Sequence, residues 1–236
     1  MLLGIETAAG LVGVAVADVG GPLAGTWLRG DRRHAETLSP AIAHTLEAAG
    51  ATLGDVEAIA LDVGPGLFTG LRVGVATAQG LAEGLGIGIL EVTSVDVLAQ
   101  ETYDAGWEGS VASVVDARRG EVFAQRYRRP PVAAGDRSDR QGVRGEDEPF
   151  RCTPGALAEE LGRDSATLLV GTGAHRYADL FAAAGLRVAA VREPSPRVLV
   201  SIAAGRLAAG AAPLPPTRVR PRYLRDADAQ INWVQR

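Results

Sequence analysis

The sequence has 236 residues, of which 47% are hydrophobic and 22% charged, and its formal net charge is −4. All 24 basic residues are arginine, so the chain has neither the lysine of a Walker A loop nor one that could form a Schiff base. The single cysteine, Cys152, excludes intrachain disulfides and fits a reducing compartment. The apolar runs are shorter than the about 20 residues that span a bilayer, and no secretory leader pattern opens the chain, so we expect a cytoplasmic protein without membrane contact.

The first half predicts, in chain order, a β-hairpin, a helix, a buried parallel strand, a glycine turn, a long helix, a strand and a third helix. Ser39 and Pro40 supply a helix start, and Gly50 supplies a stop. The predicted segments are Leu2–Glu6 with Leu11–Asp18, Pro40–Ala49, Ala58–Val63, Gly64–Gly66, Thr69–Gly84 with Thr69 as its cap, Ile87–Val92, and a helix capped at Thr93 or Ser94.

The second half repeats this order of elements, which predicts a duplicated fold with domains at residues 1–104 and 105–236. Its glycine turn at Gly171–Gly173 corresponds to Gly64–Gly66. A polar stretch at about 129–150, rich in proline and glycine, predicts a mobile surface insertion, and an arginine-rich tail ends the sequence. The other predicted segments are the hairpin VASVVDA with EVFAQRY, a helix near Gly155–Leu161, the strand Thr167–Val170, a helix from Ala174 to about Ala184, and a helix over Arg197–Gly210.

The helix predicted at Thr69–Gly84 is apolar or small almost all round, because its long polar side chains, Arg72, Gln79 and Glu83, fall in one narrow stripe. Glycines inside a helix cost about 1 kcal/mol each unless close packing offsets them. Two interpretations stay open: a central helix covered by its own domain, or a helix that the domain core shares with a second protein.

Other patterns give no catalytic residue and no metal site. His34, His44 and His175 lack metal-ligand spacing, and Cys152 lacks the motif of a reactive thiol. The glycine turn is one residue too long for a dinucleotide fingerprint. The charged turn from Asp116 to Glu121 fits a solvated hairpin tip as well as a binding loop.

Charge is distributed unevenly along the chain. Residues 1–100 carry four arginines against eleven acidic residues, whereas residues 101–236 carry twenty against seventeen. The acidic first half argues against wrapping nucleic acid, although the second half could touch it transiently.

Four stretches resemble the bacterial TsaB (YeaZ) family, the dimerization subunit of the tRNA threonylcarbamoyladenosine synthesis complex: GPGLFTGLRVGVATAQGLA, LLGIETA, RHAETLSPAI and DARRGEVF. The resemblance implies an α/β, actin/Hsp70-like (ribonuclease H-like) fold of two duplicated domains. It also implies a non-catalytic subunit that dimerizes with and activates a catalytic TsaD-like transferase, alongside a TsaE-like ATPase. A homodimer is implied for the chain alone, and tRNA contact only through the complex.

Matched residue by residue, the resemblance places the partner interface on the first and second predicted helices, and no cofactor on the chain alone. An adenine nucleotide is implied only at the junction of the assembled complex, near Glu6, Thr7 and Gly10. Leu67 and Glu6 depart from the family's usual serine and aspartate. The implied interface residues are Ile42, Leu46, Gly66, Phe68, Thr69, Gly70, Leu71, Gly74, Val75 and Ala78.

From the shared-helix interpretation we expect Gly74→Arg to leave the chain folded and to block pairing. The competing hypothesis is a small ATP-dependent phosphotransferase, with Glu6 as its acid and a nucleotide between Thr7–Gly10 and Gly171–Gly173. A peptidase lacks an evident nucleophile or metal set.

Overall fold

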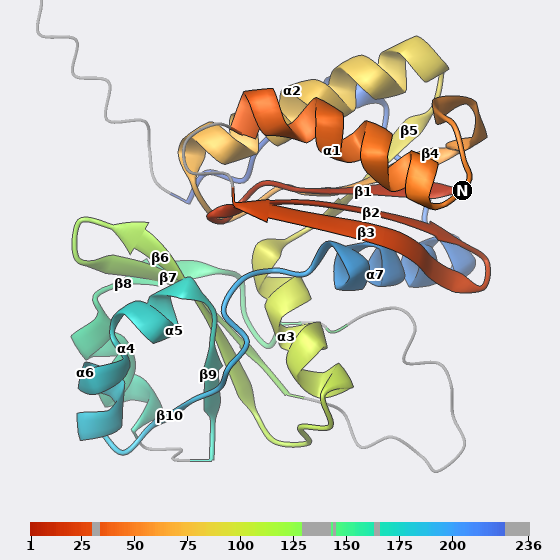
Figure 1. The fold of residues 1–236 in the computed structure, drawn as a ribbon. Coiled ribbons are helices and arrows are strands. Elements are labelled where there is room, and N and C mark those ends of the chain that lie inside the picture. The colour runs from red at the N-terminus through yellow and green to blue at the C-terminus, as the bar shows by residue number, and fades with distance from the viewer. Residues whose placement is uncertain (30–33, 129–142, 144, 163–165, 225–236) are drawn as a thin grey trace, which may run out of the picture.

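The computed structural model describes residues 1–29, 34–128, 143, 145–162 and 166–224. Within these ranges, no helix is both long enough and apolar enough to cross a membrane. The chain forms two five-stranded sheets, each with helices on both faces, stacked one above the other in Figure 1.

The first sheet has the strand order β3-β2-β1-β4-β5. Strands β1, β2 and β3 are antiparallel neighbours, while β4 and β5 continue the sheet in parallel with β1. Helices α1 and α2 cover one face and α7 covers the other (Figure 1). The bounds are β1 Leu2–Glu6, β2 Leu11–Asp18, β3 Gly21–Arg29, α1 His34–Ala48, β4 Ala58–Asp62, α2 Phe68–Leu85, β5 Gly88–Val92 and α7 Pro196–Ala208, with a short 3-10 turn at Leu53–Asp55.

The second sheet has the order β10-β9-β6-β7-β8, which is the order of the first sheet read from the other edge. Helices α4, α5 and α6 pack on one face and α3 on the other. Gly64 and Gly171, which open the two glycine turns, have φ angles of 100° and 103°. The duplicated α/β fold is therefore confirmed. The bounds are α3 Ser94–Asp104, β6 Val111–Arg118, β7 Glu121–Tyr127, β8 Phe150–Cys152, α4 Pro154–Leu161, β9 Leu168–Val170, α5 Thr172–Arg176, α6 Ala178–Ala183 and β10 Arg187–Val188.

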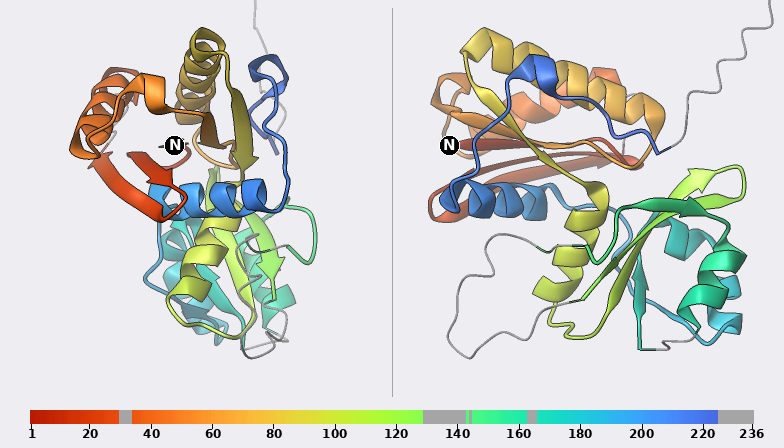
Figure 2. Two further views of the ribbon diagram at one scale, coloured as in Figure 1. Left: turned by 90° about the vertical axis from the view of Figure 1, so that its right-hand side faces the viewer. Right: turned by 180° about the vertical axis from the view of Figure 1, so that it is seen from behind.

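The chain returns to the first sheet after β10, as Figure 2 shows from two further sides. Helix α7 packs on β1 and β2, Leu214 exchanges backbone hydrogen bonds with Ile89, and Val219 lies in the core beneath α1 and α2. The predicted division at residues 104 and 105 stays a prediction, but it assigned this returning segment to the second half, whereas the segment packs against the first.

Several boundaries differ from the predicted ones. Helix α1 begins at His34 and contains Pro40 in its interior. Thr69 does not cap α2, because the helix begins one residue before it and has Leu67 at its N-cap. The helix expected at Ala174–Ala184 is divided into α5 and α6 near Tyr177. Strands β3, β8 and β10, each at an edge of its sheet, were not predicted. Most of the 129–150 insertion and the end of the tail lie outside the described residues.

A partly buried polar network joins the two halves. The hydroxyl of Tyr127 on β7 lies 2.9 Å from Oδ1 of Asp96 on α3, and Oδ2 of Asp96 forms an ion pair of 2.9 Å with Nη2 of Arg206 on α7. Burial raises the pKa of Tyr127 well above its ordinary value, so the hydroxyl stays protonated and can donate. These contacts hold the second sheet, the connecting helix and α7 in one fixed arrangement.

Candidate functional site

Helix α2 lies across the first sheet with a buried inner face, which carries Gly70, Leu71, Gly74, Val75, Ala78 and Ala82. The helix ends at Gly86, whose φ of 68° is the left-handed conformation that glycine adopts without steric cost. Apolar side chains at three- and four-residue spacing therefore point into the domain core, as helical periodicity requires.

The glycines at the start of α2 fit against the end of β1 in the same chain. A Cβ at Gly66 would overlap the carbonyl oxygen of Ala8, and one at Gly70 would overlap that of Thr7. A Cβ at Gly74 would overlap the hydroxyl of Thr7. These small residues therefore admit the chain's own backbone and not a helix of a partner, and the expectation that Gly74→Arg leaves the chain folded is wrong.

Most residues predicted to contact a partner are turned inward, which corrects their assignment as direct contacts. Phe68 and Thr69 are exposed, and Gly66 is half-buried. The interface on this helix stays a prediction, but it has to use the outer face of α2. The buried members of the predicted set are Ile42, Leu46, Gly70, Leu71, Gly74, Val75 and Ala78.

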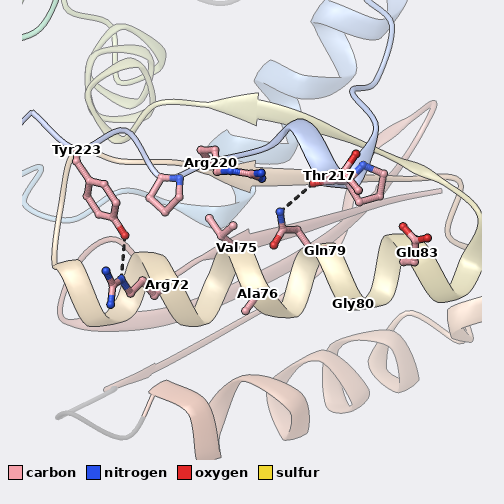
Figure 3. A pocket seen from close by; sticks show the side chains of 11 residues that line it. Arg72, Val75, Ala76, Gln79, Gly80, Glu83, Thr217, Arg220 and Tyr223 are labelled. Carbon is pink, nitrogen blue, oxygen red and sulfur yellow. Dashed lines mark hydrogen bonds between the residues drawn. The ribbon is translucent and has the colours of Figure 1, made fainter.

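The outer face of α2 carries small side chains and borders a groove. Ala76, Gly80 and Gly84 recur every four residues and are exposed, and a Cβ at either glycine would meet no other atom within 4 Å. The groove has a volume of about 740 Å³ and lies between this face and residues 216–223, which form its second wall (Figure 3). The amide of Gln79 holds that wall in place by donating to the carbonyl oxygen of Pro216 at 2.9 Å.

Three large side chains form a stacked cluster at the N-terminal end of this groove. The Arg72 guanidinium lies 3.8 Å from the ring centroid of Phe68, and its Nε donates to the Tyr223 hydroxyl at 3.0 Å. The two aromatic rings are 5.1 Å apart, and each residue is 44% exposed. Sequence reasoning missed Tyr223, because nothing in the arginine-rich tail indicates that it returns to α2. Exposed aromatic and arginine side chains held in one conformation are typical of interface hot spots.

A buried pair of acidic residues lies where β1 and β4 end. Glu6 accepts from the amide of Ala8 at 2.7 Å, and Asp62 accepts from the amide of Gly64 at 2.7 Å and the Ser94 hydroxyl at 2.8 Å. The other oxygen of each carboxyl group has no further partner. The two carboxyl groups are neighbours, since the charge of Asp62 acts on Glu6.

Protonation of this pair follows from its surroundings. Burial, and then the charge of Asp62, raises the pKa of Glu6 well above its ordinary value. Burial also raises the pKa of Asp62, although the hydrogen bonds from Gly64 and Ser94 oppose that rise. The protonated form is therefore favoured at both carboxyl groups, more strongly at Glu6 than at Asp62.

We expect Glu6→Gln to remove the pH dependence that this pair gives to stability. Because the folded-state pKa of Glu6 is raised, its contribution is complete below the unfolded value of about 4.3 and is lost as pH rises through the folded pKa, by about 1.4 kcal/mol per pH unit. The amide of glutamine can donate to Asp62 at any pH. Urea unfolding between pH 5 and pH 9 measures the difference.

The control for this experiment is Glu47→Gln, which changes an exposed carboxyl group on α1. Its unfolding free energy should follow the wild-type curve. Parallel curves for wild type and Glu6→Gln would show that Glu6 does not hold a proton in this range.

One pocket between the two halves is very small. The pocket lined by Ala8, Pro65, Ser94 and Thr172 has a volume of about 10 Å³, whereas small-molecule sites occupy about 300–1,000 Å³. The proposed nucleotide residues Glu6 and Thr7 are buried, and only Gly10 of that set is exposed. An adenine nucleotide near these residues stays a prediction.

Potential metal ligands are dispersed. Across the described parts of the chain, no three histidine, cysteine or acidic side chains converge in a way that could hold a metal ion. His34 is buried, and its Nε2 lies 3.2 Å from the carbonyl oxygen of Ala9. Burial raises the pKa of the Cys152 thiol to about 11, as expected of an unreactive cysteine.

Comparisons with known proteins identify relatives along most of the chain. Residues 29–233 match the family model described as "TsaD: tRNA N6-adenosine threonylcarbamoyltransferase". The Escherichia coli "tRNA threonylcarbamoyladenosine biosynthesis protein TsaB" is 32% identical over 66% of this chain and 64% of its own length, and the Haemophilus influenzae protein of that name is 32% identical over 62% and 61%. The matched region thus spans less than two thirds of these curated relatives.

A solved structure extends the similarity to nearly the whole fold. YeaZ from Pseudomonas aeruginosa superposes with a TM-score of 0.78 at 28% sequence identity, covering 94% of this chain and 99% of that one. The chain therefore belongs to the family that the threonylcarbamoyltransferase model describes and, within it, to the TsaB (YeaZ) family.

Proposed function

We propose that this chain is a non-catalytic partner subunit required for threonylcarbamoyl modification of the adenosine next to the anticodon of tRNAs, and that it acts in the cytoplasm. The observation that supports this proposal best is the outer face of α2: small residues that nothing in the described chain covers, beside the fixed cluster of Phe68, Arg72 and Tyr223. Such a surface allows another polypeptide to approach the helix closely and supplies large side chains to anchor it.

The proposed partner on this face is the catalytic TsaD-like transferase subunit. A TsaE-like ATPase joins the assembled complex, and an adenine nucleotide binds only at the junction of the subunits. When the transferase is absent, a second copy of this chain occupies the same face, so the homodimer and the working complex exclude one another. Contact with tRNA takes place within the complex.

The burial of Glu6 supports a non-catalytic role over the phosphotransferase alternative. An enzyme that transfers phosphate would need an acid open to its nucleotide, and Glu6 is instead buried against Asp62 and the Ala8 amide. The purified chain is expected to hydrolyse no ATP and to phosphorylate no sugar on its own. Turnover by the isolated chain would favour the phosphotransferase.

Depletion of the protein in its own cells tests the proposed function directly. We expect threonylcarbamoyladenosine to fall in total tRNA nucleosides, measured by mass spectrometry, and to return when the wild-type chain is supplied. Other modified nucleosides from the same digest serve as the internal control. An unchanged threonylcarbamoyladenosine level after verified depletion would contradict the proposal.

A further inference from the structure

The turn between β6 and β7 adopts a backbone that its sequence does not favour. Arg118 and Arg119 have φ angles of 63° and 52°, and Gly120 follows at 79°. Arg118 pairs with Glu121 after a register shift, so Arg119 and Gly120 are the two central residues of the hairpin turn. Left-handed conformations at such positions normally select asparagine or glycine, because a larger side chain brings its Cβ close to the backbone. Two successive arginines therefore occupy positions where their backbone preference opposes the fold.

The side chains of this turn form an organised basic cluster around one carboxylate. Asp116 accepts the Arg118 amide through Oδ1 at 3.0 Å, while its Oδ2 lies 3.3 Å from Nη1 of Arg118 and 3.3 Å from Nη1 of Arg176 on α5. Asp116 is only 10% exposed, whereas Arg118 is 60% and Arg176 51% exposed. The aspartate thus orients two guanidinium groups and leaves most of each open to solvent.

Positive charge is in excess here. Two guanidinium groups therefore face a single aspartate, and Arg119, the next residue of the turn, is also exposed. The nearby Glu121 lies 3.6 Å from Arg151. Guanidinium groups held in a fixed position by a carboxylate match the tetrahedral oxygens of phosphate, to which they donate pairs of hydrogen bonds. The tip of this hairpin, the turn between β6 and β7, lies at the same end of the molecule as the start of α2 in both Figure 1 and Figure 2.

We infer that this cluster, Arg118 and Arg176 around Asp116 with Arg119 next to them in the turn, is a phosphate-binding site for an RNA or a nucleotide. Residual backbone strain of this kind persists at functional positions, where a side chain is needed despite its conformational cost. The inference rests on the proposed function only for the identity of the RNA, which would be tRNA. The corresponding β1–β2 turn, TAAG, carries no charged side chain, so the site belongs to one copy of the duplicated fold.

The test removes two arginines whose side chains are proposed to bind phosphate but whose backbone conformation is unfavourable for arginine. In the double variant Arg118→Gly with Arg119→Asn, the new residues suit the left-handed conformation, so the melting temperature should stay equal to that of wild type or rise. Binding of fluorescently labelled tRNA to the full chain, followed by anisotropy at low salt, should weaken at least 10-fold. The slope of log K against log salt concentration should fall by about one to two, since each phosphate contact contributes roughly 0.9.

Separate arms identify the source of the phosphate. Weaker binding of tRNA with unchanged binding of ATP and inorganic phosphate assigns the site to an RNA backbone, and weaker binding of ATP as well assigns it to a nucleotide. The control is Arg128→Gln, an exposed arginine at the far end of β7, which should bind as wild type does. Arg119→Lys keeps the charge but loses the paired hydrogen bonds, so its affinity should lie between those of the wild type and the double variant.

Three results would overturn the inference. One is equal affinity of wild type and double variant for all three probes, including the absence of binding by both. Another is an equal loss in Arg128→Gln, which would indicate non-specific charge. The last is a double variant that binds phosphate normally but no longer binds the transferase subunit, which would indicate that the tip contacts a protein. The proposed function fails separately, if depletion leaves threonylcarbamoyladenosine unchanged while the tip still binds tRNA.

Discussion

Replacing Gly70 with alanine should lower the free energy of unfolding by roughly 3 kcal/mol or more, at the upper end of what overpacking costs. The added Cβ would overlap the backbone carbonyl oxygen of Thr7, which lies at the end of a central strand and cannot move without disturbing the sheet. Because whole domains are stable by only about 5–15 kcal/mol, this loss is a large part of the total. Urea unfolding followed by circular dichroism measures it.

Gly80→Ala is the matched control on the same helix. A Cβ at Gly80 would meet no atom within 4 Å, so only the helix preference of alanine remains, and the variant should gain up to about 1 kcal/mol. The two variants make the same chemical change and should shift stability in opposite directions. Equal shifts would show that the inner contact of Gly70 with Thr7 does not determine stability.

Ala76→Arg should abolish pairing with the transferase subunit while leaving the chain folded. Ala76 is exposed on the outer face of α2, beside the groove, so an arginine can extend into solvent in the free chain. Surface substitutions of this kind usually change stability by within about 0.5 kcal/mol. In a closely packed interface the same arginine is buried without a partner, at a cost of about 2–5 kcal/mol, which weakens affinity by about 30-fold or more.

Co-purification and titration calorimetry with the transferase subunit measure this effect. Ser201→Arg on α7 is the control, because Ser201 is exposed on the opposite side of the first sheet and should leave pairing intact. If the Ala76→Arg variant bound the transferase subunit with wild-type affinity, the outer face of α2 would not be part of the interface. Failure of both variants to fold, seen as a lost thermal transition, would contradict the exposure of these two side chains.

Local patterns in the sequence predicted most of the fold. Hairpins, buried strands and capped helices depend on neighbouring residues, and Thr93 caps α3 through the Asp96 amide as expected. The repeated order of elements predicted the duplication before any contact was known. Strand β3 was missed because Gly21, Pro22 and Gly25 suit a turn better than a strand, and its edge position in the sheet tolerates them.

The candidate site was predicted less well, because its geometry depends on contacts between distant segments. Periodicity identified α2 as a helix unsuited to water, but could not decide which neighbour covers its glycines, and the answer is Thr7 and Ala8 of the same chain. Asp62 had a local signal, an acid ending an apolar strand, but its pairing with Glu6 needs the register of β1 and β4. Tyr223 needs the return of the tail across the first sheet.

The return of α7 to the first sheet has a consequence for how the protein is made. A ribosome that has released only the first 195 residues has delivered all five strands of that sheet, but not the helix that shields Leu2, Ala60, Leu90 and Val92 from water. The nascent N-terminal half therefore emerges with one apolar face of its sheet uncovered, and it reaches its final stability only after α7 has been synthesised. Chaperones that bind exposed apolar surfaces during translation can therefore act until α7 covers this face. Truncated chains that lack α7 should aggregate rather than form a smaller functional domain.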